Sequence, residues 1–260
     1  MTTFTSHEPG VPNWIDLLAA DVDGAKVFYA GLFGWDIEDE LDADGNRIYS
    51  IARLDGKKVA GIGTIPAGVE MPSVWNSYIC TADVAATAAA VSDAGGTVLM
   101  APTQIGSSGR MASCADPTGA AFSIWEPQQH LGIEVGNEAN TYSWNELMSQ
   151  DLATAQTFYS DVFGWTYKHE AMPGGDYFVI AGGENGGLGG LMEMPSDLGS
   201  TPSYWGVYFT VAGLAATTNK VVALGGQVLM PGMELPGIGT FAVVGDPWGA
   251  AFTVIEPVAS

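Results

Sequence analysis

Residues 12–35, PNWIDLLAADVDGAKVFYAGLFGW, and residues 142–165, YSWNELMSQDLATAQTFYSDVFGW, carry one pattern twice. Each copy has a Trp near its start, then an Asp, a Phe-Tyr pair and a closing Phe-Gly-Trp, and Trp144 follows Trp14 by 130 residues. The same offset aligns two further pairs, GGTVLM at 95 with GGQVLM at 225, and DPTGAAFSIWEP at 116 with DPWGAAFTVIEP at 246. One offset that holds from the first element to the last indicates a tandem duplication.

The repeated segment predicts a strand followed by an amphipathic helix. Residues 14–20 alternate as a half-buried strand does. Asp21 can cap the helix that follows, and Gly34 can end it. Between them, apolar residues recur at helical spacing and make one face, formed by Ala25, Phe28, Tyr29, Leu32 and Phe33.

The rest of each half predicts a hairpin and then a second strand-helix-strands unit. Segments 47–54 and 58–65 flank the turn residues Asp55-Gly56, and a helix runs from Asp83 to Gly95-Gly96. Strand-like segments then lie near 97–100, 109–115 and 120–127. We therefore expect an α+β fold of four βαβββ units. The expected domains are residues 1–127 and 142–260, each with two units, joined by a polar linker at 128–141.

The charge balance excludes whole classes of partner. The chain of 260 residues has 29 acidic residues against 8 Lys and Arg, for a formal net charge of −21. Such a field repels phosphates, so we expect no binding to nucleic acid or to a membrane surface, whereas a cationic ligand would be attracted. The sequence shows no signal peptide and no apolar run near the roughly 18 residues of a membrane span, and two cysteines are too few for a disulfide framework. We expect a cytoplasmic protein.

The pattern D-(V/L)-x-x-A-x-x-F-Y-x-x-x-F-G-W after the first strand, with D-P-x-G before the last, resembles the vicinal oxygen chelate superfamily. This group contains glyoxalase I, bleomycin-resistance proteins and extradiol dioxygenases. The chain is most similar to the tandem glyoxalase-like proteins of actinobacteria, some of which are described as hydroxylases or associated with antibiotic pathways. The resemblance implies two glyoxalase-like domains, in which curled mixed sheets enclose cup-shaped cavities that hold a ligand or a metal.

The resemblance also implies where metal ligands should stand. The family spacing places them at Trp14, Asn76, Ser123, Trp144, Gly206 and Thr253. None is a His, Asp or Glu, and an indole offers no free lone pair. The three histidines lie in the N-terminal tail (His7), the linker (His130) and a polar stretch (His169), where we expect solvated surface side chains. We therefore predict no cofactor, and this pattern argues against the usual glyoxalase I and dioxygenase chemistry.

Two acids share the faces that should line the cups. Strand alternation puts Asp16 on the face of Trp14 and Glu146 on the face of Trp144. One interpretation is a buried acid that hydrogen-bonds to backbone or Tyr. Another is a counter-charge to a ligand or a general acid or base. A third is oxygen-only coordination of Mg²⁺ or Mn²⁺ by Asp16, Glu146 and Glu193.

Aromatic and polar side chains complete the predicted cups. By strand parity the cup faces also carry Asn76, Tyr78, Trp125 and Tyr208, whereas Trp75 and Trp205 should pack beneath the helices. Such a Trp-lined pocket suits a flat ligand. Our first hypothesis is a metal-free binding protein of the bleomycin-resistance kind for a hydrophobic or aromatic antibiotic or metabolite, with a cationic group as an option. The alternative is a lyase, isomerase or hydroxylase-type enzyme on the same fold, with Asp16 or Glu146 as base and with or without a divalent metal. We expect a monomer or a weak homodimer.

Overall fold

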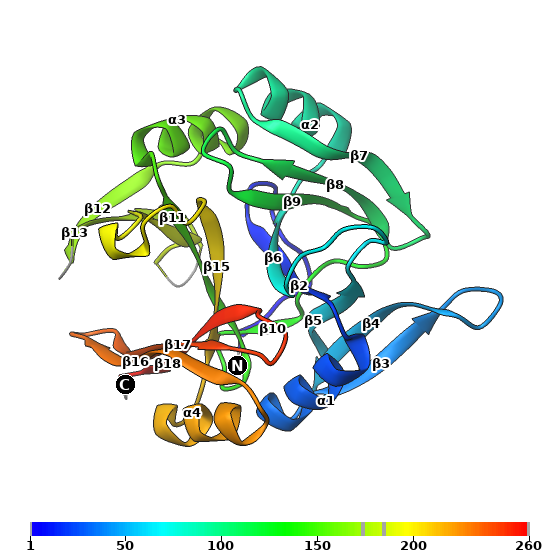
Figure 1. Ribbon diagram of the computed structural model, residues 1–260. Coiled ribbons are helices and arrows are strands. Elements are labelled where there is room, and N and C mark those ends of the chain that lie inside the picture. The colour runs from blue at the N-terminus through cyan, green and yellow to red at the C-terminus, as the bar shows by residue number, and fades with distance from the viewer. Residues whose placement is uncertain (1, 173–174, 184–185, 259–260) are drawn as a thin grey trace.

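The strands of the chain form two large mixed sheets, one from each half, as the computed structural model of the protein shows (Figure 1). The structure describes residues 2–172, 175–183 and 186–258; the outer ends of the two expected domains, residues 1 and 259–260, lie outside these ranges. Within the described residues each sheet has eight strands, and each half of the chain also contributes two α-helices. The α+β fold of four βαβββ units is therefore confirmed.

The first half forms one continuous sheet with the strand order β3-β4-β5-β2-β6-β9-β8-β7. Its first unit comprises β2 (Pro12–Ala19), α1 (Val22–Phe33), β3 (Asp36–Leu41), β4 (Arg47–Leu54) and β5 (Lys57–Thr64). Its second unit comprises β6 (Val74–Cys80), α2 (Val84–Asp93), β7 (Thr97–Ile105), β8 (Gly109–Ala115) and β9 (Ala121–Pro127). The two units join where β2 pairs with β6 antiparallel.

The second half repeats this order as β12-β13-β14-β11-β15-β18-β17-β16. Its first unit comprises β11 (Thr141–Ser149), α3 (Leu152–Phe163), β12 (Tyr167–Met172), β13 (Gly175–Ile180) and β14 (Gly189–Glu193). A 3-10 turn, η1 (Ser196–Leu198), precedes the second unit, which comprises β15 (Tyr204–Thr210), α4 (Leu214–Ala223), β16 (Gln227–Leu235), β17 (Gly239–Gly245) and β18 (Ala251–Pro257). Between the halves, β10 (Val135–Gly136) pairs with β1 (Thr2–Thr3).

Helices α1 and α3 begin and end with the residues that the sequence indicates. Asp21 accepts a hydrogen bond from the Gly24 amide at 3.0 Å, and Asp151 accepts one from the Thr154 amide at 3.1 Å. Gly34 and Gly164 close the helices with φ of 75° and 70°, a conformation that glycine adopts without a Cβ clash.

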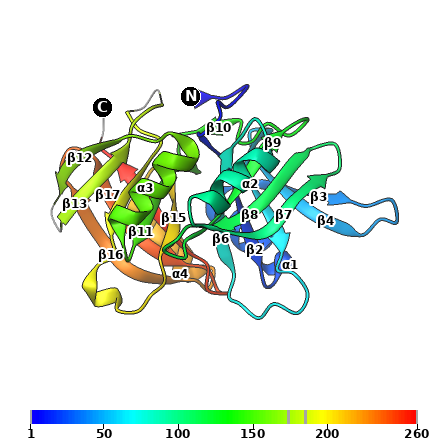
Figure 2. The same cartoon turned by 90° about the horizontal axis from the view of Figure 1, so that it is seen from above.

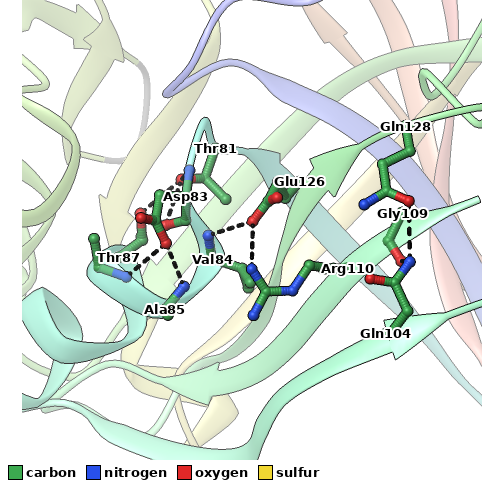
Figure 3. Close-up of polar contacts among 11 residues, drawn as sticks. Thr81, Asp83, Val84, Ala85, Thr87, Gln104, Gly109, Arg110, Glu126 and Gln128 are labelled. Atoms are coloured by element: carbon green, nitrogen blue, oxygen red, sulfur yellow. Dashed lines mark hydrogen bonds and ion pairs between the residues drawn. The ribbon is translucent and has the colours of Figure 1, made fainter.

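Helices α2 and α4 are tied at their first turn to the last strand of their own unit. Glu126 accepts a hydrogen bond from the Val84 amide at 2.9 Å and pairs with Arg110 at 3.3 Å (Figure 3). In the second half Glu256 accepts one from the Leu214 amide at 2.7 Å. A carboxylate at a helix N-terminus satisfies a free N–H and favours the helix dipole.

The hydrophobic cores cross the boundary between the halves. Helix α1 packs against α4, and α2 packs against α3. Each pair brings one helix from each half together at the junction (Figures 1 and 2). One core joins Phe28 and Phe33 of α1 to Phe209 and Phe252 of the second half. The other joins Phe122 to α3. Each half therefore depends on the other for its apolar packing.

Hydrogen bonds beneath the helices reinforce this junction. The Trp75 indole donates to the Tyr29 hydroxyl at 3.1 Å, and Tyr29 donates to Asp246 of the other half at 3.2 Å. In the pseudo-equivalent place the Trp205 indole donates to Tyr159 at 2.8 Å. The prediction that Trp75 and Trp205 pack beneath the helices is confirmed.

The two sheets meet through their inner faces, so their outer faces point away from each other. The Ser77 hydroxyl on β6 donates to the Asn145 side chain on β11 at 3.0 Å, and both residues are buried. Because side chains alternate along a strand, Tyr78 and Glu146, their neighbours, point outward on opposite sides of the molecule. We call these outer faces the first cup and the second cup.

None of the helices in the described part of the chain has the length and apolar character of a membrane span.

Candidate functional site

The first cup is built around the carboxylate of Asp16, which is 2% exposed. The hydroxyls of Tyr78 and Tyr49 donate to its Oδ2 at 2.8 and 2.9 Å. The Asn76 amide donates to its Oδ1 at 3.3 Å. Burial raises the pKa of Asp16 to about 6, against the opposing effect of these three donors. The structure therefore favours the protonated acid more than water does.

A chain of polar side chains covers this acid. Asn76 also donates to the Ser123 hydroxyl at 3.0 Å, and Ser123 shares a hydrogen bond with Ser113 at 3.2 Å. Asn76 and Ser113 are half-buried, whereas Ser123 is buried. The first cup thus satisfies both oxygens of its acid from its own side chains.

Aromatic rings fill the base of the first cup. Trp14 and Trp125 are 4% and 5% exposed, and the ring of His130 lies between them. The ring centroids of Trp14 and His130 are 4.3 Å apart, and those of Trp125 and His130 are 5.6 Å apart. The Trp125 indole donates to the His130 carbonyl at 2.8 Å, and the Trp14 indole donates to Tyr49 at 3.1 Å.

The expectation that His130 is a solvated surface residue is wrong. Its side chain is only 8% exposed because the linker folds back over the first sheet. The His130 amide donates to the Ser108 carbonyl at 2.9 Å, and the Glu134 amide donates to the Lys58 carbonyl at 2.8 Å. His169 is exposed as expected and pairs with Asp176, while His7 is partly buried and contacts the Ile133 carbonyl at 3.0 Å.

The second cup is built around Glu146, which is 6% exposed. The Tyr208 hydroxyl donates to its Oε1 at 2.7 Å. Burial raises the pKa of Glu146, while hydrogen bonding from Tyr208 and Tyr177 opposes the rise. The Trp144 indole donates to the Tyr177 hydroxyl at 2.9 Å, as Trp14 does to Tyr49. The same acid, Trp and tyrosine pair therefore stand in both cups.

The cover of the second cup differs from that of the first. Glu146 pairs across the sheet with Gly206, where Asp16 pairs with Asn76. A Cβ at Gly206 would meet no heavy atom closer than 3.7 Å, so this position offers space rather than a donor. Trp144, Tyr177 and Ile255 are half-buried. The second cup thus exposes an aromatic wall and leaves its acid free of a covering amide.

Sequence reasoning missed Tyr49 and Tyr177, the second tyrosine of each cup. A signal was present, because each faces a glycine on the neighbouring strand. A Cβ at Gly61 would lie 1.9 Å from the Tyr49 hydroxyl, and one at Gly190 would lie 1.9 Å from the Tyr177 hydroxyl. Only glycine leaves room for these rings. An alignment of the hairpins, which carry the gap between the halves, would have found both residues.

The site residues predicted from the sequence fall into two separate groups, one in each cup. The first cup holds Trp14, Asp16, Asn76, Tyr78 and Trp125, and the second holds Trp144, Glu146 and Tyr208. Glu193 joins neither group, since it is exposed and pairs with Ser149, three residues beyond the Glu146 partner Gly190. Cys80 is buried, and burial raises the pKa of its thiol to about 11, which disfavours the reactive thiolate.

The residues at the expected metal positions do not fit a metal centre. The Trp14 indole is a hydrogen-bond donor, and Gly206 has no side chain. Ser123 and Thr253 offer only neutral hydroxyls. Asp16 and Glu146 point to opposite sides of the molecule, so they cannot share an ion. Among the described residues no three His, Cys, Asp or Glu side chains converge as metal ligands. The chemistry of both cups rests on a carboxylate and two tyrosines.

Comparison with known proteins identifies the family. The profile of the Glyoxalase/Bleomycin resistance protein/Dioxygenase superfamily matches residues 11–124 and again residues 141–254. The chain therefore belongs to this superfamily, as the sequence resemblance indicates.

Two relatives match over nearly the whole chain. It is 41% identical over 256 residues to the Mycobacterium tuberculosis protein named "Putative glyoxylase CFP32", covering 97% of each chain. It is 34% identical over 265 residues to the anthracycline biosynthesis protein DnrV of Streptomyces peucetius, covering 97% of this chain and 95% of that one.

A solved structure agrees on the fold. The Mn(II)-bound glyoxalase from Novosphingobium aromaticivorans superimposes with a TM-score of 0.66 over 96% of this chain and 83% of that one. At 17% sequence identity this likeness concerns the fold alone.

Proposed function

We propose that the protein binds a flat, polycyclic aromatic metabolite in its second cup, without a metal cofactor. The observation that carries this proposal is that Glu146 stands opposite Gly206 instead of a covering amide, with two tyrosine hydroxyls beside it and the half-buried Trp144 nearby. Trp144 would stack on the ligand, while Glu146 and Tyr208 would meet a hydroxyl or an amine at its edge.

Two further facts support this class of ligand. The relative DnrV is named for anthracycline biosynthesis, and anthracyclines are polycyclic aromatic compounds. The net charge of −21 favours a ligand that carries an amine, because a strongly acidic protein attracts cations and repels anions. The superfamily as a whole includes binding proteins as well as enzymes, so the fold by itself does not choose between them.

The test is a titration with 1,4-dihydroxyanthraquinone and with an amine-bearing anthracycline, followed by tryptophan fluorescence and calorimetry. We expect saturable binding to the wild type and tighter binding of the amine at low salt. Trp144→Ala should weaken binding about 10-fold or more, and Glu146→Gln should weaken binding of the amine more than that of the neutral probe. Asp16→Asn is the matched control in the first cup and should leave the affinity unchanged. Equal losses of affinity in Asp16→Asn and Glu146→Gln would contradict the assignment of the ligand to the second cup.

A second candidate function is general acid–base catalysis in the second cup. The observation that favours it is the raised pKa of the buried Glu146, which brings the acid closer to the working range of a proton-transfer group. Turnover of a bound aromatic substrate by the wild type, with a loss of about 10² to 10⁴ in rate for Glu146→Gln, would favour this enzyme over a binding protein.

We further propose that the chain works as a monomer or a weak homodimer. Its halves already cover each other's helices, as a partner subunit otherwise would. Light scattering across a dilution series would measure the mass, and elemental analysis of protein purified without chelator would test the metal-free proposal. Near-stoichiometric manganese, iron, nickel or zinc would overturn it.

A further inference from the structure

A buried histidine in the first cup has a polar atom without a partner. His130 is 8% exposed, and its Nε2 has no hydrogen-bond partner among the described residues. Native proteins rarely leave a buried donor unpaired. The imidazole ring nevertheless contacts both Trp14 and Trp125 and fills the space between them.

The neighbours of His130 fix its protonation state. The Lys58 ammonium approaches Nδ1 at 3.3 Å, and an ammonium can only donate. Nδ1 must therefore accept, which places the proton of the neutral ring on Nε2. Burial, with the nearby positive charges of Lys58 and Arg53, lowers the pKa of His130 to about 3 and keeps the ring neutral. The unpartnered atom is thus an N–H donor.

The His130 ring contacts both tryptophans of the first cup. Its edge meets Trp14 at an interplanar angle of 86°, and it also contacts Trp125 at 64°. The backbone around it is held in position, because the Trp125 indole donates to the His130 carbonyl and the His130 amide donates to Ser108. In the second cup Ile255 stands at the position of Trp125, and Trp144 is half-buried.

We propose that His130 is a built-in occupant of the first cup, which takes the place of an aromatic ligand and restricts ligand binding to the second cup. The first cup is thus a site for a small neutral aromatic heterocycle, and the His130 imidazole fills it. The chain consequently takes one aromatic ligand, although it carries two copies of the acid and tyrosine framework. This last consequence rests on the proposed function, whereas the occupancy of the first cup does not.

The experiment empties the site and offers the missing ring as a free molecule. In the full-length chain, His130→Gly leaves a space of imidazole size between Trp14 and Trp125. Imidazole is titrated at about pH 8.5, where it is neutral, with tryptophan fluorescence, calorimetry and thermal unfolding as readouts. We expect saturable binding of one imidazole per chain and a rise in Tm of about 2 °C or more on saturation, with neither effect in the wild type.

Matched variants separate the vacated site from general destabilisation. His130→Phe keeps the ring and removes the polar atoms, so it should fold and bind no imidazole. His169→Gly removes an exposed histidine and should behave as the wild type does. A folded His130→Gly variant that binds no imidazole would overturn the proposal, as would wild-type protein that binds it with the same stoichiometry.

A measurement on the wild type keeps the proposal open to refutation if the glycine variant does not fold. Diethyl pyrocarbonate acylates accessible imidazoles, and mass spectrometry separates the three histidines. His130 should react about 10-fold or more slowly than the exposed His169, because reaction requires local opening of the linker. Equal rates in the native protein would overturn the closed first cup.

The aromatic probe then connects this inference to the second cup. 1,4-Dihydroxyanthraquinone should bind the wild type at one molecule per chain and should still do so in His130→Phe. Two molecules per wild-type chain, one of them lost in Trp14→Ala, would overturn the restriction to one cup. No binding of this probe would count against the proposed function, while the imidazole result for the first cup would still stand.

Discussion

The two cups differ in their cover and not in their framework. In both, a Trp donates to a tyrosine that lies under a glycine, and a second tyrosine donates to a buried acid. In the first cup an amide, two serines and a buried histidine then close over this framework. In the second cup a glycine stands opposite the acid.

This difference teaches which parts of a duplicated fold are free to change. The tyrosines, glycine and acid of each cup interlock across four neighbouring strands, β4-β5-β2-β6 in the first half and β13-β14-β11-β15 in the second, so a change in one disturbs the others. The covering residues Asn76, Ser113 and His130 lie around this framework, and the second cup keeps the framework with Gly206 at the position of Asn76. The two copies therefore share the framework and differ in the residue opposite the acid, Asn76 in the first cup and Gly206 in the second.

The largest expected effect is a difference in stability between variants of Trp14 in the first cup and Trp144 in the second. Trp14→Ala should cost about 3–5 kcal/mol of stability because it empties a packed space under His130, whereas the half-buried Trp144→Ala should cost roughly half as much. Urea unfolding of the two variants at neutral pH measures this. Equal losses would mean that the second cup is as tightly filled as the first.

The second prediction concerns the pH dependence of stability. Since the pKa of Asp16 is raised to about 6 in the folded protein, the folded state holds this proton more tightly than the unfolded chain does. The contribution of the protonated Asp16 to the free energy of unfolding is fully present below the ordinary pKa near 3.8 and is lost as the pH rises through about 6. The loss totals about 3 kcal/mol, of which roughly half falls above pH 5.

Asp16→Asn removes this titration. Its stability relative to the wild type should therefore improve by about 1–1.5 kcal/mol between pH 5 and pH 8. Urea unfolding at several pH values in this range, above the isoelectric point near 4.1, measures the change. Glu146→Gln should show the same direction, because the pKa of Glu146 is raised too. Parallel pH profiles for Asp16→Asn and wild type would show that Asp16 titrates normally.

The third prediction exchanges the covers of the two cups. Asn76→Gly removes the donor to Asp16 and Ser123 and should cost about 1–2 kcal/mol of stability. Gly206→Asn places an amide over Glu146 and should weaken binding of 1,4-dihydroxyanthraquinone about 10-fold, which corresponds to about 1.4 kcal/mol. Calorimetry measures the affinity. Unchanged affinity in Gly206→Asn would show that the ligand does not reach this position.

The smallest expected effect compares the starts of α2 and α4. Asp83 caps α2 by accepting from the amides of Ala85 and Ala86, whereas Gly213 precedes α4 without a side-chain cap. Asp83→Gly makes the first half like the second and should cost only a few tenths of a kcal/mol, because Glu126 still accepts from the Val84 amide. A loss above about 1 kcal/mol would show that Glu126 cannot substitute, and urea unfolding resolves the two cases.

Much of the framework could be read from the sequence. The repeated motifs predict the four units, and strand parity brings Asp16 together with Tyr78 and Glu146 with Tyr208, as observed. Tyr49 and Tyr177 escaped because they lie in hairpins of unequal length, where a fixed offset fails. His130 escaped because a polar linker has no periodic pattern, and its burial follows from backbone hydrogen bonds to Ser108 and from Trp125.

The sequence by itself determined the fold, the duplication, and the face on which each strand residue stands, because hydrophobic period and capping are local properties of the chain. The tertiary structure decided what stands opposite each group. It set Asp16 and Glu146 on opposite sides, joined the cores of the two halves, and carried His130 into the first cup. These outcomes depend on contacts between residues far apart in the chain, and no local pattern records how such segments meet.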